Sequence, residues 1–194
     1  MKEKMKKIIK LLLAFVVIIL AFNIITHKST SEKVEKYITT KGFTHTNDSK
    51  LYYKQISKLN LAEYNKNVAN NKEAVYENLC LDAKNYNLTM TRKEYLSNIE
   101  TDFTPKYDYI KEVITYSYKI IIKDVSLIYE GEYVKDYDNF TCENIYSSGI
   151  DVSDSNSTYC EKIKYDLENF YYTLIDIIDN PTLLEKMKAE NTKK

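Results

Sequence analysis

An apolar run near the N-terminus constrains this chain more than any other feature. Residues 8–26 consist almost entirely of Ile, Leu, Val, Ala and Phe, with Lys10 as the one charged residue and Asn23 near the far end. Nineteen helical residues rise about 28 Å, which matches the thickness of the hydrocarbon core. Lys10 lies one turn inside, where its ammonium group can reach the headgroups. We therefore expect a transmembrane helix over residues 8–26.

The residues before this run predict its orientation. Four lysines and one glutamate occupy residues 2–7, and the positive-inside rule then places residues 1–7 in the cytoplasm as a short tail. A cleaved signal peptide is the alternative, but its apolar core usually has 7–15 residues and ends at small residues. Here the run is longer, and Ser29-Thr30-Ser31 resembles an Ala-x-Ala site poorly. We expect an uncleaved signal anchor that crosses the plasma membrane once, with the lipid bilayer as its partner and the C-terminal part outside the cytoplasm.

Beyond the anchor, the sequence predicts a juxtamembrane helix at 27–42 and one exported domain at 43–194. Ser29 and Glu32 form a capping box, and Gly42 is well placed as the residue that ends the helix. Three further boxes predict helical segments at 58–86, after Thr91 and after Thr158. The last has the strongest apolar pattern, through Ile178, and Pro181 then begins a short tail helix.

Alternating apolar residues predict strands in the same domain. Residues 114–122 alternate apolar with polar side chains over nine positions, and 125–129 alternate again after Asp124. Residues 51–56 form another candidate strand, and Gly131 predicts a bulge or bend. Nineteen tyrosines are distributed along the chain, and half-buried packing is favoured over a dedicated aromatic binding surface. The fold class is α+β, with several helices and an antiparallel sheet.

Three cysteines allow one crosslink but no metal or redox motif. In an exported domain, Cys142 and Cys160 could close a loop of about 19 residues, and such a disulfide stabilises by about 3 kcal/mol. Reduced thiols are the alternative. Cys80 falls in a segment read as helical, where a small core residue is favoured. Cysteine and histidine spacing fits no metal site, and we expect neither a metal nor a cofactor.

Charge is balanced overall but unevenly distributed. With 28 basic and 28 acidic residues, the chain lacks the basic excess of a nucleic-acid-binding protein. Residues 124–168 contain 11 acidic and three basic residues, which predicts an acidic surface; its members are Asp136, Asp138, Glu143, Asp151 and Asp154. Residues 151–156 superficially resemble a calcium loop. They lack a glycine at the sixth position, and Lys162 stands where the glutamate belongs, so a solvated loop is favoured.

The motifs of common enzyme classes do not occur. Three glycines leave no room for a Gly-rich phosphate loop, and His27 and His45 accompany no nucleophile motif. A pair of carboxylates could do acid–base work, but nothing among the many acidic residues selects one pair. We expect that the protein is not an enzyme.

The first fifth of the chain resembles a group of known membrane proteins. The Lys-rich start, the aliphatic anchor, Val34-Glu35-Lys36-Tyr37-Ile38 and Lys41-Gly42-Phe43 resemble a loose group of small single-pass membrane proteins of low-GC Gram-positive bacteria. It covers residues 2–43, and the group has no assigned activity to transfer.

These features predict a membrane-anchored extracytoplasmic domain that binds a protein or cell-envelope partner. An immunity-type protein that protects its host membrane from a toxin is one alternative. A bitopic subunit of a secretion or conjugation machine is another, although the anchor lacks the small-xxx-small face of tightly paired helices.

Overall fold

A computed structural model describes Ile18 and residues 35–45, 50–134, 139–148 and 156–177. The chain divides into two compact units, residues 1–41 and 42–194. Apart from Ile18, the expected anchor lies outside the described residues, and no described helix is long and apolar enough to cross a membrane.

In the first unit, residues 35–40 are helical, and the amide of Lys41 donates to the carbonyl oxygens of Tyr37 and Ile38. The second unit begins at Gly42, whose φ of 84° is the left-handed conformation expected of a residue that ends a helix.

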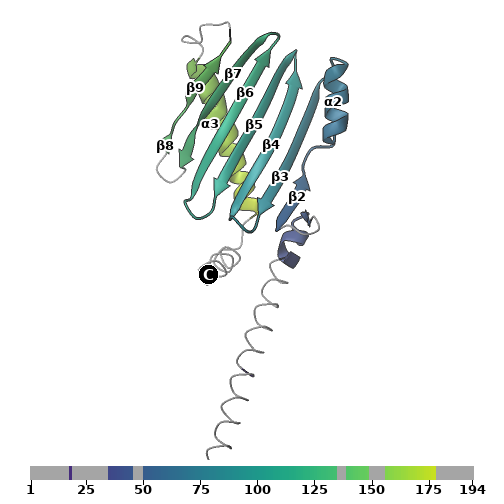
Figure 1. Ribbon diagram of the computed structural model, residues 1–194, viewed down its shortest axis with the longest axis vertical. Helices are drawn as coiled ribbons and strands as arrows, with labels where there is room; N and C mark the ends of the chain where they lie inside the picture. The colour runs from purple at the N-terminus through teal and green to yellow at the C-terminus, as the bar shows by residue number, and fades with distance from the viewer. Residues whose placement is uncertain (1–17, 19–34, 46–49, 135–138, 149–155, 178–194) are drawn as a thin grey trace, which may run out of the picture. The chain divides into compact units, whose positions relative to one another are not determined.

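The second unit is built on one antiparallel sheet (Figure 1). Its strands are β1 (Thr44–His45), β2 (Leu51–Gln55), β3 (Ala74–Asp82), β4 (Asn87–Leu96), β5 (Ile99–Asp108), β6 (Val113–Ile122), β7 (Val125–Val134), β8 (Asn139–Phe140) and β9 (Glu143–Ser147). They follow one another across the sheet in chain order from β1 to β8, and β9 also pairs with β7.

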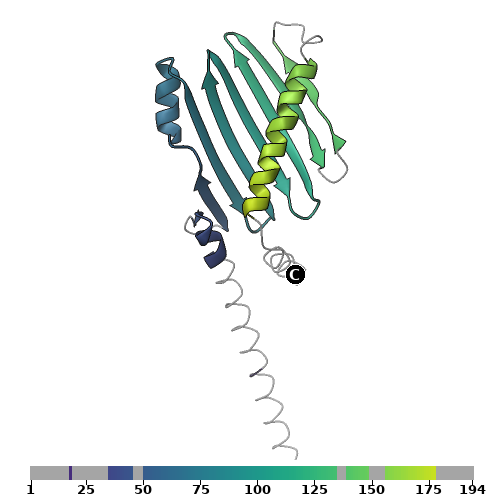
Figure 2. The ribbon, with the colours of Figure 1, turned by 180° about the vertical axis from the view of Figure 1, so that it is seen from behind.

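Two helices accompany the sheet. The short helix α2 (Leu61–Ala69) connects β2 to β3, and Asn60 and Glu63 form the capping box that the sequence predicts. The long helix α3 (Asn156–Ile177) crosses one face of the sheet diagonally, as Figure 2 shows. The molecule is therefore α+β, as the sequence predicts.

The core lies between α3 and the sheet. Four α3 side chains at helical spacing are buried: Ile163, Leu167, Phe170 and Leu174. Opposite them, the strands bury alternate residues, among them Phe103, Ile114, Tyr118, Leu127 and Tyr129. Several tyrosines thus pack in the core, which agrees with the packing interpretation of the tyrosine-rich composition.

Three strands and one helix match the sequence prediction closely. The structure places β2, β6 and β7 over the segments whose alternation predicts strands, and α3 over the segment with the strongest helical pattern. The predicted tail helix after Pro181 lies outside the described residues.

One predicted helix is correct only in part, and another is wrong. Only residues 61–69 of the segment 58–86 are helical, and residues 74–82 form β3, so Cys80 is a half-buried strand residue. The box at Thr91–Glu94 lies within β4, where Thr91 and Glu94 pair with Asn78 and Thr101 of the neighbouring strands. In both segments, pairing with the neighbouring strands of the sheet outweighs a local pattern that also fits a helix.

Candidate functional site

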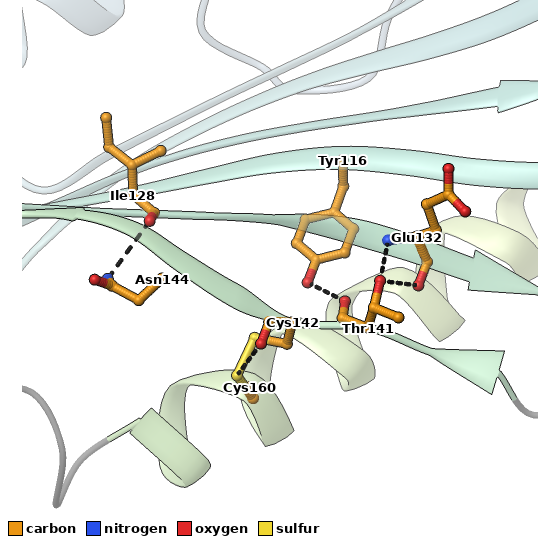
Figure 3. The surroundings of a disulfide bond; sticks show 7 residues. All are labelled: Tyr116, Ile128, Glu132, Thr141, Cys142, Asn144 and Cys160. Atoms are coloured by element: carbon orange, nitrogen blue, oxygen red, sulfur yellow. Dashed lines mark hydrogen bonds between the residues drawn. A yellow bond between two sulfur atoms is a disulfide. The ribbon is translucent and has the colours of Figure 1, made fainter.

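A disulfide fixes the start of α3 to the edge of the sheet. Cys142, between β8 and β9, is bonded to Cys160 in the first turns of α3, with the two Cα atoms 5.9 Å apart (Figure 3). This is the pairing that the sequence predicts. The helix is thereby held over β7 at the point where its apolar face begins.

Gly131 allows the β8–β9 segment to lie close to β7. Gly131 stands opposite Tyr116 of β6, and the Tyr116 hydroxyl donates a 2.8 Å hydrogen bond to the carbonyl oxygen of Thr141 (Figure 3). A Cβ at position 131 would collide with that carbonyl and lie 2.9 Å from the hydroxyl oxygen. The role predicted for Gly131 as a bulge is therefore corrected: the irregularity in pairing falls at Ile128/Tyr129, and Gly131 provides room for a close backbone approach.

An ion cluster joins the middle of α3 to β4. Asp166 is only 6% exposed; its Oδ2 accepts a 3.0 Å hydrogen bond from Lys162, and its Oδ1 lies 3.8 Å from Nη1 of Arg92. Nη2 of Arg92 lies 3.7 Å from Glu94. Burial lowers the pKa of Lys162, but its hydrogen bond with Asp166 and its contact with Tyr118 outweigh that effect and raise the pKa above its usual value.

Beyond this cluster, the sheet face carries an open groove with a volume of about 420 Å³. In Figure 2, α2 lies beside β3 at one corner of the sheet, and the diagonal course of α3 does not pass over that corner. The groove is lined by residues 56–59, 73–75, 77 and 94–96. Ile56, Val75 and Leu96 contribute apolar surface and are 43%, 39% and 47% exposed.

One wall of the groove is held by Ser57. The Glu77 backbone amide donates a 3.0 Å hydrogen bond to the Ser57 hydroxyl, and the amides of Ile56 and Ser57 both donate to the carbonyl oxygen of Glu77. These bonds fix the segment between β2 and α2 against β3. The wall is therefore preformed by backbone bonding, which is typical of binding sites that exist before the ligand arrives.

The groove carries net negative charge. Its lining includes Glu73, Glu77, Glu94 and Lys58. Glu94 forms an ion pair with Arg92, with 3.7 Å between its Oε2 and the Arg92 Nη2. No ion pair joins Glu73 or Glu77 to another residue that the structure describes. On β3, Glu77 follows Val75 by two residues on the same face, and Glu94 lies directly across from Val75. An exposed apolar side chain is thus flanked by carboxylates.

The acidic residues that the sequence singles out are only partly described. Glu143 is exposed at the start of β9, paired in register with exposed Glu130. Asp136, Asp138, Asp151 and Asp154 lie outside the described residues. Within the described ranges, no group of His, Cys, Asp and Glu side chains could hold a metal ion. His45 lies in β1 with its ring 4.9 Å from that of Tyr52, and His27 is not described.

Sequence reasoning missed the groove. Its lining comes from three segments, two of which the sequence assigns to helices, so the side chains are brought together only by sheet pairing. The sequence feature that points to it is Val75 with Glu77 two residues later. In a strand these two side chains lie on the same face, so an apolar and an acidic residue would stand side by side there.

The fold and site define a half-covered antiparallel sheet with a preformed acidic groove. Comparisons with protein-family models, curated proteins and solved structures find no significant match for this chain. The resemblance of residues 2–43 to single-pass membrane proteins therefore stays a prediction.

Proposed function

We propose that this protein is a single-pass, membrane-anchored domain outside the cytoplasm that binds a partner protein through the groove and catalyses no reaction. The groove is the observation that carries the binding proposal. It is preformed, apolar in part and not crossed by α3, and concave surfaces of this kind are where proteins bind ligands and partner segments.

The disulfide supports the location. Bonds such as Cys142–Cys160 persist in oxidising compartments and are rare in the cytoplasm, where thiols are kept reduced. The lysines before residues 8–26 favour the same orientation. Location and anchor are thus supported by two independent features of the chain.

The proposal is tested by photo-crosslinking in living cells. A benzophenone amino acid replaces Val75 in the groove of the full-length chain or, as a matched control, exposed Ile110 in the turn between β5 and β6. We expect an adduct of discrete mass from position 75 and none from position 110. Equal adducts from both positions, or none from position 75, would contradict a binding role for the groove.

A further inference from the structure

The chemistry of the groove selects one kind of occupant. Resting on the proposed function, we propose that the groove receives an extended segment of the partner whose groove-facing side, made of every second residue, alternates aliphatic with basic side chains. The apolar floor would receive the aliphatic side chain, and the carboxylates beside it would receive the basic ones.

The geometry of β3 and β4 sets the spacing. Val75 has Glu77 two residues along its own strand and Glu94 directly across. Side chains two residues apart on an extended strand lie about 7 Å from each other. Successive side chains of an extended segment point to opposite faces. A bound segment with a leucine over Val75 therefore brings basic residues two positions before or after it within reach of these carboxylates.

The charge balance excludes an acidic segment. Among the described residues of the lining, Lys58 is the one basic residue and three are glutamates. Glu73 and Glu77 have no ion-pair partner within the described ranges, so their charge is available to a ligand. An acidic segment or an anionic lipid surface would bring like charges together.

Peptide binding to the full chain in phosphatidylcholine nanodiscs tests the inference. Three fluorescent heptapeptides with serine at every second position are compared by anisotropy, with empty nanodiscs as the blank. At the positions between these serines, one alternates lysine with leucine, one glutamate with leucine and one lysine with serine. We expect the lysine–leucine peptide to bind at least about tenfold more tightly than the other two. Comparable binding of either control peptide, or no binding of any, overturns the inference.

Charge reversal locates the binding. Glu73→Lys with Glu77→Lys should weaken the lysine–leucine peptide about tenfold, because attraction is replaced by repulsion at two positions. Glu130→Lys with Glu132→Lys, exposed on β7, is the matched control and should change affinity less than about twofold. Circular dichroism of each variant establishes that it folds. Equal weakening by both pairs would overturn the assignment to the groove.

Failure of this inference is distinguishable from failure of the proposed function. If the photo-crosslink from position 75 survives Glu73→Lys with Glu77→Lys, the partner exists but is not basic, and only this inference falls. If position 75 gives an adduct of twice the chain mass, the occupant is a second copy and the inference is overturned. If position 75 gives no adduct, the proposed function itself fails.

Discussion

Gly131 and Tyr116 show how a single missing side chain shapes the sheet edge. With no Cβ at position 131, the Tyr116 hydroxyl reaches across β7 to the carbonyl oxygen of Thr141, which places neighbouring Cys142 for its bond with Cys160. Burial raises the pKa of the Tyr116 hydroxyl above its ordinary value, so it stays a hydrogen-bond donor into the alkaline range. The sequence marks Gly131 as special, but the reason depends on a segment that no local pattern connects to it.

We predict that Gly131→Ala lowers the free energy of unfolding by about 1–3 kcal/mol, because the new methyl group meets backbone that cannot move cheaply. Urea unfolding followed by circular dichroism measures the change. Glu130→Ala, exposed on the same strand, is the control and should shift stability by less than about 0.5 kcal/mol. Equal effects of the two changes would show that the close approach is unimportant.

The ion pair between Asp166 and Arg92, the one arginine of the chain, gives a second prediction. Asp166→Asn keeps the volume of the side chain but leaves Arg92 and Lys162 without their shared carboxylate. We expect a loss of about 1–2 kcal/mol, below the value for a fully buried pair because the Arg92 side chain is 32% exposed. Exposed Glu161→Gln on the same helix is the control.

A double-mutant cycle with Arg92→Met separates this pair from its surroundings. If Arg92 and Asp166 interact, Asp166→Asn costs less in the Arg92→Met background, by about 0.5 kcal/mol or more. Additive losses in the same urea experiment would contradict the ion pair.

At the level of elements, the sequence predicts strands and helices where one period dominates. Alternation is regular in β6 and β7, and α3 buries Ile163, Leu167, Phe170 and Leu174 at helical spacing, so both periods are readable. In β3 and β4, the face that buries Leu79 and Met90 also carries Glu77 and Glu94. These charged residues interrupt the alternation of apolar and polar side chains. The pairing of β4 with β5 also depends on the turn at Ser97–Asn98. Both residues adopt positive φ, but the turn contains no glycine, so the sequence does not mark it as a hairpin turn.

The disulfide that links α3 to the sheet edge gives a prediction about the stability of the helix. Replacing Cys142 and Cys160 with serine should lower stability by roughly 3 kcal/mol, because a loop of this length gains entropy in the unfolded chain. Hydrogen exchange should also rise first in the early turns of α3. Cys80→Ser, which breaks no disulfide, is the control. Unchanged stability of the double variant would show that the bond does not hold the helix.

For the whole molecule, sequence patterns predict the class but not the site. The α+β class and the cysteine pairing follow from patterns within short segments. The groove does not, because Ile56, Val75 and Leu96 come from three segments and meet only through the sheet and the Ser57 bonds. The position of α3 matters equally, since its diagonal course does not pass over this corner of the sheet (Figure 2).

Buried tyrosines predict how the whole domain responds to alkali. Burial raises the pKa of the Tyr64, Tyr109, Tyr116, Tyr118 and Tyr129 hydroxyls above the ordinary value of 10.0. Above about pH 10 the unfolded chain releases these protons while the folded chain retains them, so stability falls as pH rises. The raised pKa of Lys162 acts in the same direction.

We expect urea midpoints to be nearly constant from about pH 8 to 9 and to decline between about pH 10 and 11. The Cys80→Ser variant removes thiol–disulfide exchange as a cause of the decline. A midpoint that rises across pH 10, or stays constant to pH 11, would contradict protonated tyrosines in the core.

We propose that the residues beyond the anchor form a disulfide-held domain outside the cytoplasm, and thiol labelling of intact cells tests both its location and its disulfide. The full chain carries Cys80→Ser and Ile110→Cys, the latter at an exposed turn, and a membrane-impermeant maleimide is read by mass. We expect one label in intact cells without reduction, and two more, on Cys142 and Cys160, only after reduction and denaturation. Labelling at position 110 only after lysis, with Cys142 and Cys160 already free, would place the domain in the cytoplasm and overturn this proposal.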